Sequence, residues 1–368
     1  MKKNSGKNFL PLLTALLLFL GGCQKAIDHS PVAINEVAQK IIDPRELKDF
    51  VQINLVGDNN EFSPLHTDAN LVNAWGIAFP ASGPAWVTSF GTSKSVVYKG
   101  DGTAARGPVT IPTHTTTTGG HPTGIIANST DDFKLPNGKK ALFIFAEAEG
   151  LLSAWNGGDA AIKMADDSSG EVYLGLALAS NRGDNFLYAA NFAQGKIDVY
   201  DKNWVRVNKP FIDPSLPAGY LPLNIQNIDG QLYVMYGQPG TGGEVISPSN
   251  GFVDVFNTDG SFVKRFISQG QLNAPWGITK APAGFWSDDT ANQDIFLVGN
   301  FGDGHINAYD SDGKFQGHLR AHGQPIKIER LWTIAFAPAT SASFDHNQLF
   351  FAAGPGKEQH GLFGFIRK

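Results

Sequence analysis

Ala274-Pro275-Trp276-Gly277-Ile278 is one copy of a stretch that recurs along the chain and decides the fold. The other five copies also open an apolar segment, in most cases with a glycine near its start. They are Asn73-Ala74-Trp75-Gly76-Ile77, His121-Pro122-Thr123-Gly124-Ile125, Tyr173-Leu174-Gly175-Leu176, Leu223-Asn224-Ile225-Gln226 and Leu331-Trp332-Thr333-Ile334. When Gly76, Gly124, Gly175, Gln226, Gly277 and Thr333 are taken as equivalent, the steps are 48, 51, 51, 51 and 56 residues. Such a period, with four short strands per unit, predicts a six-bladed β-propeller rather than a helical solenoid.

The third segment of each unit supports this register. Lys94-Ser95-Val96-Val97-Tyr98 and Gly251-Phe252-Val253-Asp254-Val255-Phe256 alternate with period two, so one face packs on the neighbouring blade. Turns rich in Asp, Asn and Gly follow, and such turns supply the positive φ that tight hairpins need. Asp310-Ser311-Asp312-Gly313 resembles the start of a calcium loop, but the rest of an EF-hand loop is missing and equivalent turns recur, which favours a hairpin.

The last unit is one strand short. Residues 331–336, 348–353 and 362–366 supply three apolar segments before the chain ends, whereas residues 50–56 precede the first complete unit. We expect this N-terminal segment to supply the outer strand of the last blade, because that pairing closes the ring and removes an exposed edge. The predicted fold is therefore all-β, a six-bladed β-propeller closed by its N-terminal strand.

The composition agrees with an all-β protein. The chain is 42% hydrophobic and 17% charged, with 42 glycines and 21 prolines, as short strands joined by tight turns require. The formal net charge is −5, and no run of Lys or Arg exceeds two residues. A nucleic-acid partner is therefore excluded, because it would need clustered basic residues on a basic domain.

The N-terminus predicts export. Lysines at positions 2, 3 and 7 precede an almost wholly apolar segment, residues 9–20, and about twelve residues are too few to span a bilayer. The segment ends in Leu20-Gly21-Gly22-Cys23, which resembles the lipobox of bacterial lipoproteins, whose cysteine is diacylated and becomes the new N-terminus. Cys23 is the only cysteine, so disulfides and a catalytic thiol are excluded. The alternative is an incidental thiol beside an ordinary cleavage site.

These features predict three segments: a lipoprotein signal peptide over 1–22, a lipidated polar tether over 23–49 and the propeller over 50–368. The membrane is thus a predicted partner, through a lipid on Cys23, and the predicted location is the cell envelope. Gln24 after the cysteine, in place of Asp, indicates the outer membrane if enterobacterial sorting rules apply.

Several motifs together resemble an uncharacterised family of exported bacterial propellers that is similar to NHL-repeat proteins. They are Leu71-Val72-Asn73-Ala74-Trp75-Gly76-Ile77-Ala78, Asn273-Ala274-Pro275-Trp276-Gly277-Ile278, Gly299-Asn300-Phe301-Gly302-Asp303-Gly304 and His360-Gly361-Leu362-Phe363-Gly364-Phe365. The resemblance covers about residues 50–366 and implies the six-bladed fold, but it brings no established activity and no catalytic residues. A more distant resemblance, at the level of the fold, is to gluconolactonase-type propellers, which hold a divalent metal in the channel; their motifs are not clearly present.

Inner-strand starts and the ends of second strands should converge on one mouth of the central channel. The candidates at the inner-strand starts are Asn73, His121, Asn224 and Arg330, and those at the second-strand ends are Ser89, Glu147, Asn191 and Asn300. An oxygen-rich ring suits Ca²⁺ or another divalent cation, with Glu147, Asn191 and Asn300 as ligands. The competing interpretation is that these side chains satisfy backbone groups and channel waters. It is favoured because Glu147 is the single acid of the ring and calcium normally recruits more carboxylates.

Two hypotheses of function follow. The first is a non-enzymatic binding or scaffold propeller at the envelope that recognises a protein or a glycan. The second is a metal-assisted hydrolase or lactonase with its site at the channel mouth and His121 as the base. Neither a Gly-x-Ser-x-Gly elbow nor a His-Glu-x-x-His motif is present, which favours the first hypothesis. The recurring Trp75, Trp276 and Trp332 are expected to be core or channel-wall residues rather than a sugar platform.

Overall fold

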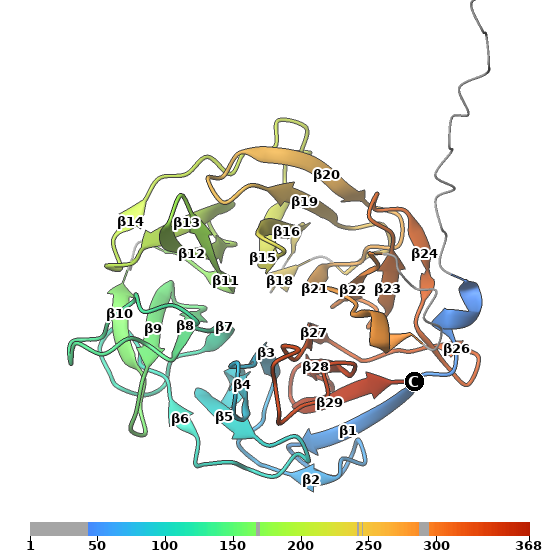
Figure 1. Cartoon of the computed structure of the whole chain (residues 1–368), viewed down its shortest axis with the longest axis horizontal. Helices are drawn as coiled ribbons and strands as arrows, with labels where there is room; N and C mark the ends of the chain where they lie inside the picture. Colours follow the sequence, from blue (N-terminus) through green and yellow to red (C-terminus); the bar gives the residue numbers. More distant parts are fainter. Residues whose placement is uncertain (1–42, 167–169, 241–242, 245, 287–293) are drawn as a thin grey trace, which may run out of the picture. The chain divides into compact units, whose positions relative to one another are not determined.

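The computed structural model describes residues 43–166, 170–240, 243–244, 246–286 and 294–368, whose six large β-sheets are arranged around a central axis as propeller blades (Figure 1). The predicted signal peptide and most of the predicted tether, residues 1–42, lie outside these ranges. The six-bladed all-β fold is confirmed. No helix in the described part of the chain is long and apolar enough to cross a membrane.

Each of blades 1 to 5 consists of four antiparallel strands, ordered from the channel outward. Blade 1 contains β3 (Ala74–Ala78), β4 (Ala85–Ser89), β5 (Lys94–Tyr98) and β6 (Val109–Thr110); blade 2 contains β7 (Pro122–Ala127), β8 (Phe143–Glu147), β9 (Leu151–Trp155) and β10 (Ile162–Asp166). Blade 3 contains β11 (Tyr173–Asn181), β12 (Asp184–Asn191), β13 (Lys196–Asp201) and β14 (Arg206–Val207). Blade 4 contains β15 (Leu221–Ile228), β16 (Gln231–Gly237), β19 (Phe252–Phe256) and β20 (Phe262–Ser268); blade 5 contains β21 (Pro275–Lys280), β22 (Phe296–Asn300), β23 (Ile306–Tyr309) and β24 (Phe315–His318).

Blade 6 closes the ring as expected. Its strands are β27 (Leu331–Phe336), β28 (Leu349–Ala353), β29 (Leu362–Arg367), β1 (Val51–Gly57) and β2 (His66–Thr67). β1 pairs antiparallel with β29, from Val51 opposite Arg367 to Gly57 opposite Leu362. The N-terminal strand therefore completes the last blade, and the prediction is confirmed.

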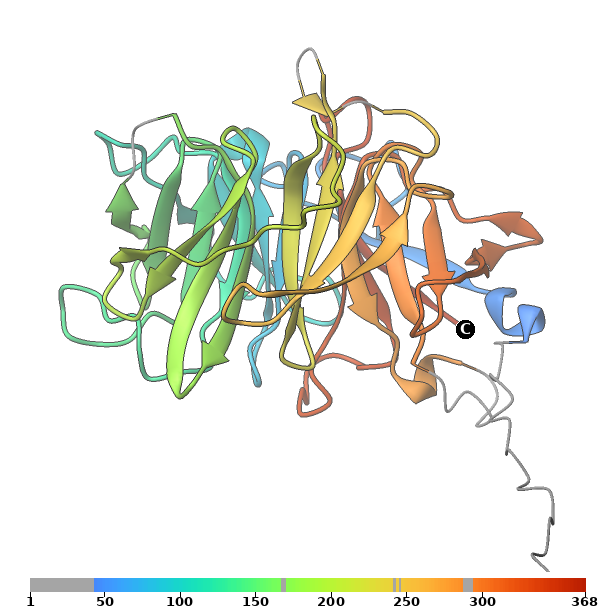
Figure 2. The same ribbon diagram turned by 90° about the horizontal axis from the view of Figure 1, so that it is seen from above.

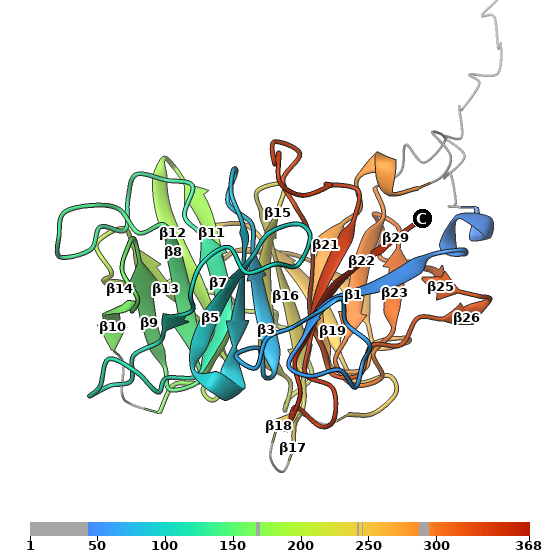
Figure 3. The ribbon, with the colours of Figure 1, turned by 90° about the horizontal axis from the view of Figure 1, so that it is seen from below.

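Several short helices and strands lie outside the six large sheets. They are the 3₁₀ helices η1 (Pro44–Leu47), η2 (Phe90–Thr92) and η3 (Ala283–Phe285), and the strands β17 (Pro239–Gly240), β18 (Gly243–Glu244), β25 (Arg320–Ala321) and β26 (Gln324–Pro325). β17 and β18 project beyond the blades on one face, seen from two sides in Figures 2 and 3. They connect the second and third strands of blade 4, so this is the face on which the second strands end.

Every inner strand contains a β-bulge near its start, where the register with the second strand shifts. The residue after the bulge is Gly175 in blade 3 and Gly277 in blade 5, as predicted. In blade 4 it is Asn224 and not Gln226, because the bulge lies between Pro222 and Asn224. The predicted equivalence of Gln226 was wrong, since constant spacing does not reveal where a strand begins to pair.

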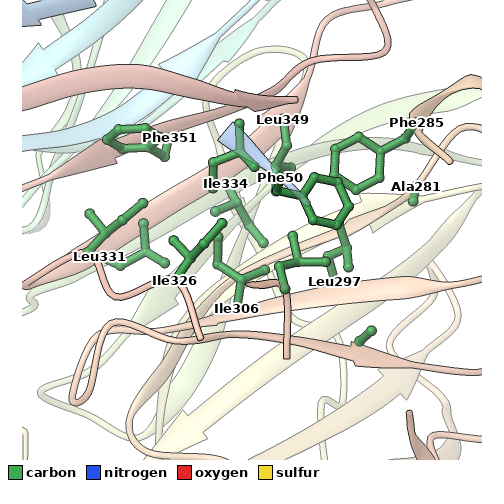
Figure 4. Packing of buried hydrophobic residues seen from close by; sticks show 14 of the residues in the cluster. Phe50, Ala281, Phe285, Leu297, Ile306, Ile326, Leu331, Ile334, Leu349 and Phe351 are labelled. Carbon is green, nitrogen blue, oxygen red and sulfur yellow. The ribbon is translucent and has the colours of Figure 1, made fainter. Parts of the chain in front are cut away.

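The segment before the closing strand packs into the core between blades 5 and 6. Phe50 is 1% exposed, and its ring stacks on Phe285 at 5.0 Å (Figure 4). Ile306 of blade 5 and Phe351 of blade 6 belong to the same cluster. Leu47 of η1 is also buried there. The last residues of the predicted tether are thus part of the folded body.

Replacing Phe50 with Ala should therefore weaken ring closure. We expect Phe50→Ala to lower the free energy of unfolding by about 3–5 kcal/mol, the usual cost of removing a fully buried aromatic ring. Val51→Ala, at an adjacent position that is 42% exposed, is the control and should change it by less than about 0.5 kcal/mol. Denaturant unfolding measures both, and equal effects of the two variants would contradict this role of Phe50.

His360 fastens the other end of the closing strand. Its Nδ1 lies 2.9 Å from Asp58 Oδ2, and the backbone N–H of Gly361 donates to Asp58 Oδ1 at 3.1 Å. The hydrogen bond to Asp58, followed by the charges of Asp58 and Glu61, raises the pKa of His360 above its ordinary 6.5. His360 therefore binds its proton more tightly in the folded state than in the unfolded state.

This linkage has a definite sign. The stabilisation by His360 should be complete below its unfolded pKa and should disappear as pH rises through the raised folded pKa. The difference in unfolding free energy between the wild type and His360→Gln should accordingly be larger at about pH 5.5 than at about pH 8.5. A difference that stays constant across this range would show that the imidazolium does not stabilise the closure.

Candidate functional site

The residue in each inner-strand bulge has a side chain that is buried near the channel axis. These side chains, which we call the channel plug, are 0–8% exposed and come one from each blade: Trp75, Thr123, Leu174, Leu223, Trp276 and Trp332. All except Thr123 pack in one apolar cluster, although they belong to five different blades. Side chains from separate blades can meet in this way only near the axis. The expectation that the three tryptophans are core or channel-wall residues agrees with this packing.

A continuous stack of rings runs across the plug from blade 2 to blade 5. Its members, which we call the aromatic stack, are in order His121, Phe90, Trp75, Trp332 and Phe301. Successive ring centroids are 4.8, 5.3, 3.5 and 4.1 Å apart. The closest pair, Trp75 and Trp332, is nearly parallel, with 13° between the ring planes. Arg330 extends the stack, with its guanidinium carbon 4.7 Å from the centre of the Phe301 ring.

Each end of the aromatic stack carries a basic side chain beside a glutamate. His121 Nδ1 hydrogen-bonds Glu149 Oε1, and the His121 side chain is 44% exposed. At the other end, Arg330 Nε lies 3.9 Å from Glu358 Oε1, and burial raises the pKa of Glu358. Asn73 connects this end to the plug, because it accepts a hydrogen bond from Trp332 Nε1 at 2.8 Å and donates to Glu358 at 3.4 Å.

The backbone is strained around the Arg330 end. Asn73, Ala274 and Arg330 each precede an inner strand and have φ of 50°, 48° and 53°. Lys357 and Glu358 follow with φ of 56° and 69°. The left-handed region costs a non-glycine residue roughly 1–2 kcal/mol. Strain of this kind is concentrated at functional sites in other proteins, where the surrounding structure maintains it.

Three of the predicted second-strand residues hold the loops that enter their own blades. Ser89 Oγ accepts from the backbone N–H of Val72 and donates to the Val72 carbonyl, both at 2.9 Å. Asn191 Oδ1 accepts from the Val172 N–H at 3.4 Å, while its Nδ2 donates to Asp198 at 2.7 Å. Asn300 Nδ2 donates to the carbonyl of Gln271 at 2.8 Å. Asn224, which is fully buried, donates to the Trp276 carbonyl of the next blade.

Glu147, the fourth of these residues, is different. It is fully buried, and neither carboxyl oxygen has a hydrogen-bond partner among the described residues. Burial raises its pKa to about 8, against a smaller opposite effect of the nearby Ser153 hydroxyl, which does not reach hydrogen-bond geometry. Glu147 shares no hydrogen bond with Asn191 or Asn300. Over the ranges that the structure describes, no three His, Cys, Asp or Glu side chains form a group able to hold a metal ion.

Sequence reasoning missed Phe90, Phe301 and Glu358. A signal existed for the phenylalanines, since Ser89-Phe90, Asn191-Phe192 and Asn300-Phe301 place the same polar-aromatic pair at the end of a second strand. Phe90 and Phe192 are partly buried against the plug, and Phe301 belongs to its cluster. No comparable signal marks Glu358, which contacts Asn73 from a distant part of the chain.

Comparison with known proteins identifies relatives of unknown function. Two uncharacterised proteins of Acanthamoeba polyphaga mimivirus are 34% and 32% identical to the chain over 345 residues. The first match covers 88% of this chain and 82% of the viral protein, and the second covers 88% of each. No family model matches the chain. The relatives are viral, so a bacterial source and export remain predictions.

Two solved structures are distantly similar. A gluconolactonase from Xanthomonas campestris has a TM-score of 0.49 and 13% identity, covering 80% of this chain and 87% of its own. A streptogramin B lyase has a TM-score of 0.49 and 15% identity, covering 86% of this chain and 97% of its own. Structural similarity at this TM-score and sequence identity gives no information about the activity of this chain.

The stacked tryptophans should be visible in solution. Because Trp75 and Trp332 are nearly parallel at 3.5 Å, their indole transitions should couple and give a paired positive and negative band in the far-ultraviolet circular dichroism spectrum. Trp332→Phe should remove the contribution of this pair, while the Trp86–Trp155 pair, whose ring centroids lie 4.6 Å apart, keeps its own. Trp204→Phe is the control, because Trp204 packs edge-on against Phe133 and not against another indole. A spectrum that Trp332→Phe changes no more than Trp204→Phe does would contradict the stacked geometry.

Proposed function

We propose that this chain, which belongs to the same family as the two mimivirus proteins, is a binding propeller that recognises a glycan at the mouth of its channel. The observation that carries the proposal is the aromatic stack with a basic side chain and a glutamate at each end. Aromatic faces bind the CH face of a sugar ring, while charged and amide groups bind its hydroxyls. Trp75, Trp332 and Phe301 are 2–5% exposed, so the mouth offers a glycan the ring of Phe90 and the polar groups at the two ends of the stack.

The accessible parts of the mouth fit this role. The His121 side chain is 44% exposed and that of Arg330 is 22% exposed, so both can meet a ligand. Phe90, Val172 and Phe192 are partly buried against the plug and add apolar surface. The plug beneath them is buried, so we expect a ligand to lie on the mouth and not to thread the channel.

A metal-assisted hydrolase or lactonase is less well supported. Its proposed ligands would be Glu147, Asn191 and Asn300, but Glu147 is fully buried and the two asparagines hold other groups. The geometry of the three proposed ligands therefore favours binding over metal-assisted hydrolysis.

The proposal includes the predicted lipid anchor. A lipid on Cys23 would hold the protein at an envelope membrane, and the intervening residues would let the propeller stand away from it. Support comes from the leader and the lipobox-like Leu20-Gly21-Gly22-Cys23. A surface-held propeller of this kind would present its mouth to glycans of the envelope or its surroundings.

A glycan array probed with the purified intact chain tests the proposal. We expect a defined set of glycans to bind, and both Arg330→Ala and His121→Ala to weaken that binding at least about tenfold, equivalent to about 1.4 kcal/mol. Arg320→Ala and His66→Ala are matched controls, because Arg320 lies in the β25–β26 hairpin and His66 lies in β2 at the rim. The absence of glycan binding, or equal losses in all four variants, would contradict the proposed site.

A further inference from the structure

A closed set of oxygen atoms lies beside the candidate site, at the entrance to blade 2. Its centre is Glu147, the last residue of β8, whose two carboxyl oxygens have no hydrogen-bond partner within the described part of the protein. Ser153 Oγ of β9 is also buried there without a partner. Buried polar groups are nearly always satisfied in native proteins, so two such neighbours require an explanation.

Gly120 shows how closely the entering loop approaches Glu147. A Cβ on Gly120 would lie 1.9 Å from the Pro112 carbonyl oxygen and 2.7 Å from Glu147 Oε2. Both oxygens therefore lie against the Gly120 backbone, on the side where a side chain would project. The Pro112 carbonyl oxygen and Glu147 Oε2 are both acceptors when Glu147 is ionised. The nearby Gly120 N–H cannot satisfy them, because it donates to the Ile111 carbonyl at 3.1 Å.

The surrounding charges do not supply a protein cation. Glu149 and Asp166 are close enough to raise the pKa of Glu147 through their negative charges. The basic groups nearby are already bound: His121 hydrogen-bonds Glu149, while His114 and Lys163 each approach Asp166 to 2.7 Å. The oxygens around Glu147 thus form a small region of negative potential with no basic partner of their own among the described residues.

We propose that Glu147, the Ser153 hydroxyl and the Pro112 carbonyl form a closed binding site for a small monovalent cation, for which sodium is the probe. One carboxylate balances one monovalent charge. Ca²⁺ would need six to eight oxygen ligands and generally more carboxylates. The site differs from the predicted channel set, because Asn191 and Asn300 take no part in it.

The ion would join three segments of blade 2. It would connect the loop that ends at Gly120 to the second and third strands, and His121 follows Gly120 directly. Occupancy would thereby hold His121 at the end of the aromatic stack. The cation site does not depend on the proposed glycan binding, since it rests on buried oxygens that a ligand at the mouth does not reach.

Thermal unfolding of the intact chain in matched salts tests the site, at about pH 9, where Glu147 is ionised because its pKa is raised to about 8. We expect the wild-type Tm to rise with each tenfold increase in sodium chloride relative to choline chloride of equal ionic strength, because ligand that binds only the folded state stabilises it. The isosteric Glu147→Gln should remove this sodium-specific rise, and Ser153→Ala should reduce it. Glu61→Gln, at a side chain that is 60% exposed, is the control and should retain it.

Sodium-23 NMR provides a second readout that does not depend on unfolding. Line broadening of sodium by the wild type and by Glu61→Gln, but not by Glu147→Gln, is the expected result. Equal Tm values in sodium and choline, or an unchanged sodium response in Glu147→Gln, would overturn the proposal. Stabilisation by micromolar calcium with none by sodium would overturn the assignment to a monovalent ion. Loss of glycan binding with an intact sodium response would instead separate this site from the function of the mouth.

Discussion

The close approach of neighbouring inner strands at their bulges is the constraint on which the rest of the structure depends. A Cβ on Gly124 would lie 2.7 Å from the Leu176 backbone nitrogen, and one on Gly277 would lie 2.7 Å from that of Ile334. Glycine is therefore required where blade 2 meets blade 3 and where blade 5 meets blade 6. Side chains reinforce the same junctions, as when Thr88 donates to the Thr123 carbonyl of the next blade at 2.7 Å. Six inner strands held this closely bring their bulged side chains together as the plug.

This constraint explains how much of the fold could be predicted. Glycine recurs in the sequence because inter-blade contact demands it, and that recurrence helps to reveal the blade count. The closing strand follows instead from the last unit being one strand short. The recurrence of glycine fails in blade 6, where Thr333 follows the bulge, and in blade 4, where Asn224 takes the place of glycine and donates to Trp276 of the next blade. Because blade 4 has no glycine at this position, the constant spacing of 51 residues between repeats points to Gln226 as the equivalent residue. Register inside a strand depends on local pairing, which spacing alone does not encode.

The candidate site was predictable in position but not in chemistry. Ser89, Asn191 and Asn300 do end second strands, but their partners are backbone groups of loops whose course the sequence does not reveal. The aromatic stack was visible in part, through the tryptophans that recur with the blades. Glu358 could not be inferred, because its contact with Asn73 arises only when the last blade meets the first. Contacts that form only when the ring closes cannot be inferred from the sequence of a single repeat.

Ring closure and the mouth share one loop, and this links stability to the proposed function. The segment after β28 carries Glu358, which faces Arg330 and Asn73, and His360, which binds Asp58 beyond the closing strand. The backbone N–H of Asn73 also donates to the His360 carbonyl at 3.0 Å. The loop is thus held from the closure side and from the mouth side at once. The strained φ angles of Asn73 and Glu358 persist because both attachments hold the loop, so the closing strand also shapes the Arg330 end of the aromatic stack.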